Sequence, residues 1–176
     1  MHRTMLLALA VMTTLAATAS GRESAADRFY QRLRALEGEW EGTLQWSGGR
    51  DASGSLRATY VLTAGGHSLI ENLFMDAATT ASMSSVYHID GSDLRMTHYC
   101  LARNQPRLKS TTIDEAAGIV EFAEVDVTGT DPPNRAHVQK VRLQLVGADE
   151  LRVWFTFGGG SSSTTDVEAI SLRRKK

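Results

Sequence analysis

The sequence predicts an all-β fold: an antiparallel β-barrel of about eight to ten strands, preceded by one short N-terminal helix. From residue 39 onward, apolar side chains recur at every second position, which is the period of a half-buried strand. Turn residues separate these segments at short, regular intervals. No helix-like segment of useful length interrupts them, which excludes a βαβ architecture.

The composition is that of an ordinary globular protein. The chain has 176 residues, 42% apolar and 22% charged, which argues against disorder and suits one domain with a sizeable core. The formal net charge is −1, so the chain lacks the basic character that is expected of a nucleic-acid-binding domain. A single cysteine excludes an intramolecular disulfide framework and a multi-cysteine metal site.

The N-terminus has the layout of a secretory signal peptide. Arg3 precedes an apolar run over 4–17, and Ala17-Thr18-Ala19 supplies the small residues of a cleavage site. The run is short for a membrane span, which needs about 20 apolar residues. We therefore expect a signal peptide over 1–19, a barrel domain over 20–176, and a periplasmic or secreted protein with no membrane span.

One short helix is predicted ahead of the strands. Ser24 is a suitable N-cap, and Asp27 stands three residues later, as in a relaxed capping box. Phe29 and Leu33 follow at helical spacing, with arginines on the other faces. Gly38 is expected to end the helix, because glycine is common where helices stop.

Ten strand-like segments follow, each bounded by turn residues. They are predicted near 39–46, 54–63, 67–75, 82–89, 94–102, 107–113, 118–127, 136–146, 150–157 and 165–173.

The first segment resembles the opening strand of lipocalin-like (calycin) barrels. It reads Leu-Glu-Gly-Glu-Trp-Glu-Gly over 36–42, a Leu-x-Gly-x-Trp-x-Gly pattern after a short helix. In those barrels the tryptophan fills the closed end, so the resemblance implies that Trp40 is buried there. The residue chemistry agrees, since Gly38 allows a sharp turn and Gly42 a bend beside a large apolar side chain.

The middle of the chain resembles an uncharacterised bacterial family, a domain of unknown function with a lipocalin-like barrel. The matching segments are a Tyr-His-x-Asp-Gly turn over 87–91, a Thr-His-Tyr-Cys strand over 97–100 and an Asn-Gln-Pro-Arg loop over 104–107. This resemblance implies a fold and no assigned activity. A more distant similarity, to nitrobindin-like barrels, implies haem held by a histidine, although the haem-binding residues of those barrels match no position here.

The Asp-Gly-Ser-Asp turn over 90–93 fixes which side chains of its hairpin point inward. A two-residue loop at its centre pairs the strands so that Tyr87 faces Met96 and Ser85 faces His98. A one-residue slip would instead bury an arginine and a second histidine, which the energy of charge burial disfavours. The residues expected inside are therefore Tyr87, Met96, His98 and Cys100.

The preceding strand, 67–75, has two candidate inner faces. Leu69 and Leu73 share one face with Glu71, and the other face alternates apolar and polar residues. The apolar count slightly favours the first face, so Glu71 is also expected inside, near Tyr87 or His98.

The candidate ligand-binding residues lie inside the predicted barrel or at its rim. They are Tyr87, His98, Glu71, Arg107, Met96 and Cys100. An inward His98 is a hydrogen-bonded core residue, a ligand contact, or a metal or haem ligand. Cys100 reads as a small buried hydrophobe. Arg107 belongs to a turn, or reaches from the rim to an anionic group of a ligand.

A barrel of this size can enclose one small ligand among apolar walls. We expect a cavity of a few hundred Å³, the usual volume of small-ligand sites. Its expected walls are Leu69, Leu73, Met83, Met96, Phe155 and Phe157.

The sequence contains no specific catalytic motif, and the histidines beyond the signal segment stand at scattered positions, which is weak material for a metal site. Our first hypothesis is an exported protein that binds a small apolar or amphipathic molecule, and no cofactor is required for it. The alternatives are an enzyme or haem-binding protein that uses the same cavity, and an envelope interaction protein whose barrel is filled with side chains.

Overall fold

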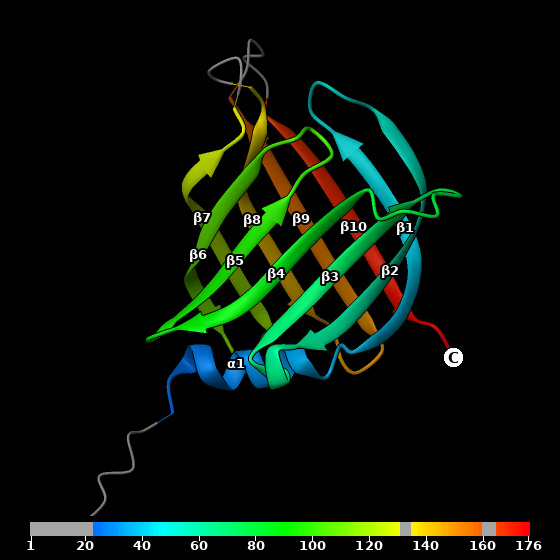
Figure 1. Cartoon of the computed structure of the whole chain (residues 1–176). Coiled ribbons are helices and arrows are strands. Elements are labelled where there is room, and N and C mark those ends of the chain that lie inside the picture. The colour runs from blue at the N-terminus through cyan, green and yellow to red at the C-terminus, as the bar shows by residue number, and fades with distance from the viewer. Residues whose placement is uncertain (1–22, 131–134, 160–164) are drawn as a thin grey trace, which may run out of the picture.

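A computed structural model describes residues 23–130, 135–159 and 165–176, so the expected signal peptide over 1–19 lies outside the described residues. The described residues form ten antiparallel strands that close into one barrel, in the order β1-β10-β9-β8-β7-β6-β5-β4-β3-β2 (Figure 1). Each strand pairs with its neighbours in sequence, and β10 closes on β1. The predicted all-β class, antiparallel barrel and preceding helix are confirmed.

The strands begin and end within a few residues of their expected positions. They are β1 (Gly38–Ser47), β2 (Ala52–Thr63), β3 (Ser68–Met75), β4 (Met83–Asp90), β5 (Asp93–Tyr99), β6 (Gln105–Asp114), β7 (Ile119–Thr128), β8 (His137–Leu145), β9 (Glu150–Gly158) and β10 (Asp166–Arg174), with a short 3-10 turn η1 (Ala64–Gly66) between β2 and β3.

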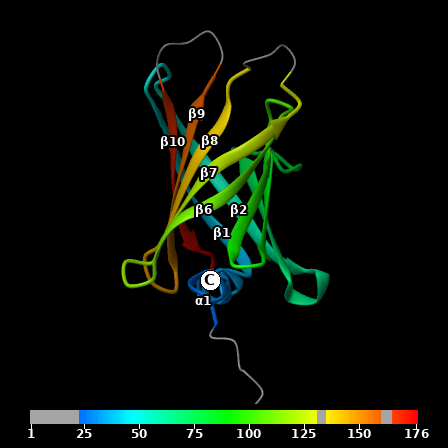
Figure 2. The ribbon, with the colours of Figure 1, turned by 90° about the vertical axis from the view of Figure 1, so that its left-hand side faces the viewer.

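Helix α1 (Ala25–Arg34) lies across one end of the barrel (Figures 1 and 2). The Ser24 hydroxyl accepts a hydrogen bond from the backbone N–H of Asp27 at 3.0 Å, and the Asp27 carboxylate accepts from the N–H of Ser24, which completes the capping box. Phe29 and Leu33 are fully buried against the barrel. The helix ends before Gly38, because the glycine has φ +130° and already begins β1. Among the described residues, no helix is long and apolar enough to cross a membrane.

Trp40 closes the same end of the barrel from inside. Its side chain is 1% exposed, and its indole N–H donates to the carbonyl of Leu36 at 2.8 Å. The Tyr60 ring meets it edge-on at 6.0 Å, and the Arg174 guanidinium lies over its ring at 4.5 Å. Trp40 therefore joins β1, β2, β10 and the turn after α1 into one closed base.

The hairpin β4–β5 has the predicted register. Asp90 pairs with Asp93 across a two-residue turn, Tyr87 pairs with Met96, and Ser85 pairs with His98. The period of two then places these inward residues on the core face, as expected.

The connections β1–β2, β3–β4 and β5–β6 lie at the end away from α1, which we call the mouth of the barrel (Figure 1).

Candidate functional site

A row of polar side chains crosses four neighbouring strands inside the barrel. Tyr60 pairs with Glu71, Glu71 with Ser85, and Ser85 with His98, from β2 through β5. Because paired residues on one sheet face stand side by side, the row is continuous. Glu71, Ser85 and His98 have no exposed surface. Tyr87, two residues after Ser85 on the same face of β4, also has no exposed surface.

The Glu71 carboxylate accepts hydrogen bonds from two tyrosine hydroxyls. The Tyr60 O–H donates to one carboxylate oxygen at 2.6 Å, and the Tyr87 O–H donates to the other at 3.1 Å. Burial raises the pKa of Glu71, while the hydrogen bonds from Tyr60, Ser85 and Tyr87 lower it. The same burial raises the pKa of both tyrosines.

His98 stands at the end of the row, and only one of its two ring nitrogens has a hydrogen-bond partner among the described residues. Its Nδ1 lies 3.0 Å from the Ser85 hydroxyl, whereas its buried Nε2 has no hydrogen-bond partner in the described part of the chain. Burial lowers the pKa of His98 to about 4, so the imidazole is neutral at neutral pH. Its ring packs 5.0 Å from the ring of Phe155.

Glu168 on β10 is a second buried carboxylate, and our sequence analysis missed it. Its side chain has no exposed surface, and neither oxygen has a hydrogen-bond partner among the described residues. Burial raises its pKa to about 7. The sequence could have indicated this position. Glu168 stands two residues before Ile170 and four before Leu172, so the period of two places it on the apolar face of β10.

Phe155 neighbours both of these buried residues. It is the Cα partner of Glu168 across β9 and β10, and its ring centroid lies 5.0 Å from that of His98.

A pocket of about 360 Å³ opens at the mouth, and its lining includes neither Glu168 nor His98. Its lining is mainly apolar and aromatic and comes from both sides of the barrel: Trp46, Arg50, Met75, Met83, Cys100, Leu101, Ala102, Ala136, Phe157 and Asp166. The rings of Trp46 and Phe157 lie 5.0 Å apart. Trp46 is the β1 partner of Glu168, so this aromatic pair stands beside the residue that carries the buried carboxylate.

The mouth pocket differs from the deep cavity that we expected. Met83 and Phe157 do line it, but the remaining expected wall residues pack in the core below. They are Leu69, Leu73, Met96 and Phe155. Burial at 0 to 1% exposure shows that the lower barrel is filled by side chains, which leaves the free volume near the mouth.

The candidate residues predicted from sequence divide into three groups. Tyr87, His98 and Glu71 lie together inside the barrel, and Met96 is packed in the core beside them. Cys100 is half-buried and lines the mouth pocket, where burial raises the pKa of its thiol.

Arg107 is placed elsewhere, and the expectation that it reaches the mouth is wrong. Pro106 and Leu108 are the inward residues of β6, so Arg107 has the opposite phase and points outward. Its guanidinium pairs with Asp126 across the outer face of β6 and β7.

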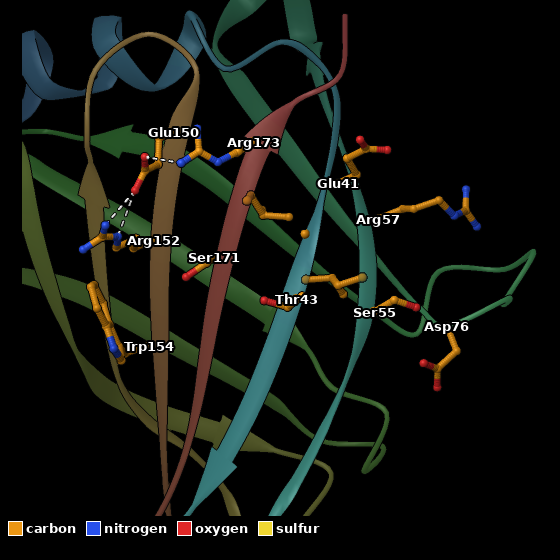
Figure 3. Close-up of a pocket in the computed structure, with 13 residues that line it drawn as sticks. Glu41, Thr43, Ser55, Arg57, Asp76, Glu150, Arg152, Trp154, Ser171 and Arg173 are labelled. Carbon is orange, nitrogen blue, oxygen red and sulfur yellow. Dashed lines mark hydrogen bonds and ion pairs between the residues drawn. The ribbon is translucent and has the colours of Figure 1, made fainter.

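A larger hollow, of about 890 Å³, lies on the outer face of β9, β10, β1 and β2 (Figure 3). Three of its charged groups are paired with one another: the Glu150 carboxylate accepts from Arg152 at 2.7 Å and from Arg173 at 3.3 Å. A Cβ on Gly42 would lie 1.8 Å from the Ser171 carbonyl oxygen, so β1 and β10 meet too closely there for any other residue. We therefore place the candidate site at the mouth.

Neither haem nor a metal ion fits the described residues as they stand. His98 Nε2 could ligate iron, but the imidazole has no exposed surface and Phe155 packs against its ring, which leaves no room for a macrocycle. The described residues contain no group of three or more His, Cys, Asp or Glu side chains able to hold a metal ion.

These features define a class of protein: a closed, ten-stranded antiparallel barrel with a helix over one end and a pocket at the other. No family model and no curated protein matches the sequence.

Solved structures do share the fold. The crystal structure of Rv2717c from M. tuberculosis is similar with a TM-score of 0.56 at 15% identity, covering 84% of this chain and 98% of that one. A DUF3598 family protein of unknown function from Nostoc punctiforme is similar with a TM-score of 0.56 at 14% identity, covering 81% of this chain. Our chain spans 48% of that protein. At such identities the likeness shows the barrel fold alone.

Proposed function

We propose that this protein is an exported, lipocalin-like barrel that binds a small apolar or amphipathic molecule at its mouth. One observation supports this above the others: an apolar pocket opens at the mouth, and Glu168 and His98, each two residues from a lining residue of that pocket, have buried atoms without partners within the described residues. Buried polar atoms in folded proteins are nearly always hydrogen-bonded, so missing partners need an explanation. A bound molecule with a polar end would supply them.

The pocket has the character of a small-ligand site. Its volume of about 360 Å³ lies within the usual range, and aromatic and sulfur-containing side chains such as Trp46, Phe157 and Met83 dominate its walls. Leu101 at the rim is 67% exposed, which leaves apolar surface available to a ligand that enters from solvent.

Two alternative functions remain, an enzyme and an envelope interaction protein. An enzyme could use neutral His98, backed by Ser85 and Glu71, as a general base. An envelope interaction protein would act through its outer surface, and the filled lower barrel favours that reading. A side chain that fills the mouth pocket should weaken ligand binding if the first proposal holds. An interaction through the outer surface would not change.

The test is a titration of the mature chain with the neutral fluorescent dye N-phenyl-1-naphthylamine. Ala102 lines the pocket, so Ala102→Trp should fill it and weaken dye binding at least about tenfold, the loss that corresponds to roughly 1.4 kcal/mol of contact energy. Ala148→Trp, on the β8–β9 turn at the opposite end, is the matched control and should bind as the parent does.

Equal binding by both variants, or no binding by the parent, would count against the mouth as a ligand site. As a second test, native mass spectrometry of protein purified from its own host should reveal a bound molecule. The loss of that molecule in Ala102→Trp would identify it as the occupant of the pocket.

A further inference from the structure

The chemistry of the candidate site narrows the class of ligand. Glu168 has two buried carboxylate oxygens without hydrogen-bond partners among the described residues, and an ionised carboxylate can only accept hydrogen bonds.

His98 contributes no acceptor of fixed identity. Its Nδ1 lies 3.0 Å from the Ser85 hydroxyl, and either group can donate to the other. Because the role of Nε2 depends on which tautomer of the neutral imidazole is present, the acceptors that define the ligand are the two oxygens of Glu168.

The charges inside the barrel have one sign. Among the described residues, the fully buried carboxylates are Glu71 and Glu168, and no lysine or arginine is buried with them. Arg50 is the cation that lowers the pKa of Glu168, and its side chain is 60% exposed. Arg50 lies 3.5 Å from the Asp166 carboxylate and 4.7 Å over the Trp46 ring, so it is engaged at the rim.

We propose, on the basis of the proposed function, that the ligand is an amphipathic amine. Its apolar body would lie in the mouth pocket, and its ammonium group would displace the Trp46–Phe157 pair and donate to the Glu168 carboxylate. An ammonium carries three donors and no acceptor, which matches the two unpartnered carboxylate oxygens of Glu168. Its positive charge offsets that of the buried carboxylate.

The same arrangement disfavours a fatty acid. The carboxylate of such a ligand would approach Glu168 with a like charge and find no buried cation among the described residues. A neutral alcohol could donate one hydrogen bond but would leave the charge of Glu168 unpaired. The expected order of affinity is therefore amine, alcohol, carboxylate for one chain length.

The experiment compares octylamine, octanol and octanoate by displacement of N-phenyl-1-naphthylamine from the mature protein at pH 8. Octylamine should bind at least about tenfold more tightly than octanol, because a charge-assisted hydrogen bond is about twice as strong as a neutral one. Glu168→Gln should reduce octylamine to the affinity of octanol and leave octanol unchanged. Asp51→Asn, an exposed change of the same charge at the mouth end, should keep the amine preference.

A pH series on the unmodified protein gives a second readout. The amine stays protonated between pH 6 and 8, since its pKa resembles that of lysine at about 10.4. Octylamine affinity should fall as the pH drops through the Glu168 pKa of about 7, whereas octanol affinity stays constant. The ionisable groups facing Glu168 are Arg50, Glu71 and Cys100, so the disappearance of this dependence in Glu168→Gln assigns it to Glu168.

The outcomes separate the two proposals. If octylamine and octanol bind equally, or octanoate binds best, the amine is overturned and the mouth pocket stands as a ligand site. If Glu168→Gln keeps the amine preference, the amine is likewise overturned. If none of the three molecules displaces the dye, or the dye itself does not bind, the proposed function fails.

Discussion

At the scale of single residues, Glu168 is the most consequential side chain in the barrel. A carboxyl group without hydrogen-bond partners among the described residues, and without exposed surface, is destabilising when ionised. Natural cores avoid such groups unless they serve a purpose. The protonation of Glu168 should therefore be visible in the stability of the empty protein.

Glu168→Gln should stabilise the protein at alkaline pH and have little effect at acidic pH. The folded pKa is about 7, raised from 4.5, so the stability contributed by this carboxyl is fully present below pH 4.5 and is lost as the pH rises through 7. That loss is about 3 kcal/mol at most, and glutamine does not titrate. The melting temperature of the variant should exceed that of the parent by roughly 6 to 12 °C at pH 8 and differ little at pH 4.5.

Thermal unfolding followed by circular dichroism at both pH values measures this difference. Asp51→Asn removes the same charge from an exposed turn and should leave the melting temperature nearly unchanged at either pH. A difference between Glu168→Gln and the parent that is the same at pH 4.5 and pH 8 would show that Glu168 does not titrate in this range.

At the scale of elements, the sequence predicted what depends on local chemistry. The Asp-Gly turn at 90–93 specified the β4–β5 register, because a one-residue slip would have buried Arg95. Arg107 was expected at the rim because Asn-Gln-Pro-Arg was interpreted as a loop or the start of a strand, with no inward or outward face assigned to it. Gln105 already begins β6, and the inward Leu108 sets the phase of that strand.

Glu168 shows why the site was harder to predict than the fold. Alternation places a residue on a face, and it predicted Glu71 and His98 there. Whether a buried polar atom finds a partner depends on strands far apart in sequence, such as β5 and β10. Only the closed barrel reveals that Glu71 is satisfied by Tyr60 and Tyr87 while Glu168 has no such donors among the described residues.

The closed base of the barrel should depend on Trp40. Trp40→Ala removes a side chain that is 1% exposed, its hydrogen bond to Leu36 and its contacts with Tyr60 and Arg174. The expected loss is about 3–5 kcal/mol of unfolding free energy, the usual penalty for a buried large aromatic residue. Chemical denaturation gives this value. Trp154→Ala on the outer face of β9 is the matched control, and a comparable loss there would contradict a special role for Trp40.

At the scale of the whole molecule, the two ends of the barrel are built differently. The base is closed by α1 and Trp40, with the Arg28–Glu115 ion pair tying the helix to the turn before β7. The mouth carries the pocket, the half-buried Trp46–Phe157 pair and the unpartnered Glu168 below it. The packed, ion-paired end is therefore the closed base, and the free volume of the proposed site lies at the opposite end.

Export is the remaining prediction for the whole chain, and the layout of the fold is compatible with it. The described structure begins at Glu23, so cleavage after Ala19 keeps α1 with its Ser24 cap and all ten strands. We expect the protein recovered from the periplasm or medium of a Gram-negative host to begin at Ser20, as read by N-terminal sequencing and intact mass. Ala17→Arg should block cleavage, because signal peptidase sites require small residues, and should leave a precursor that begins at Met1. Recovery of folded, unaltered protein that still carries Met1 or His2 outside the cytoplasm would contradict a cleaved signal peptide.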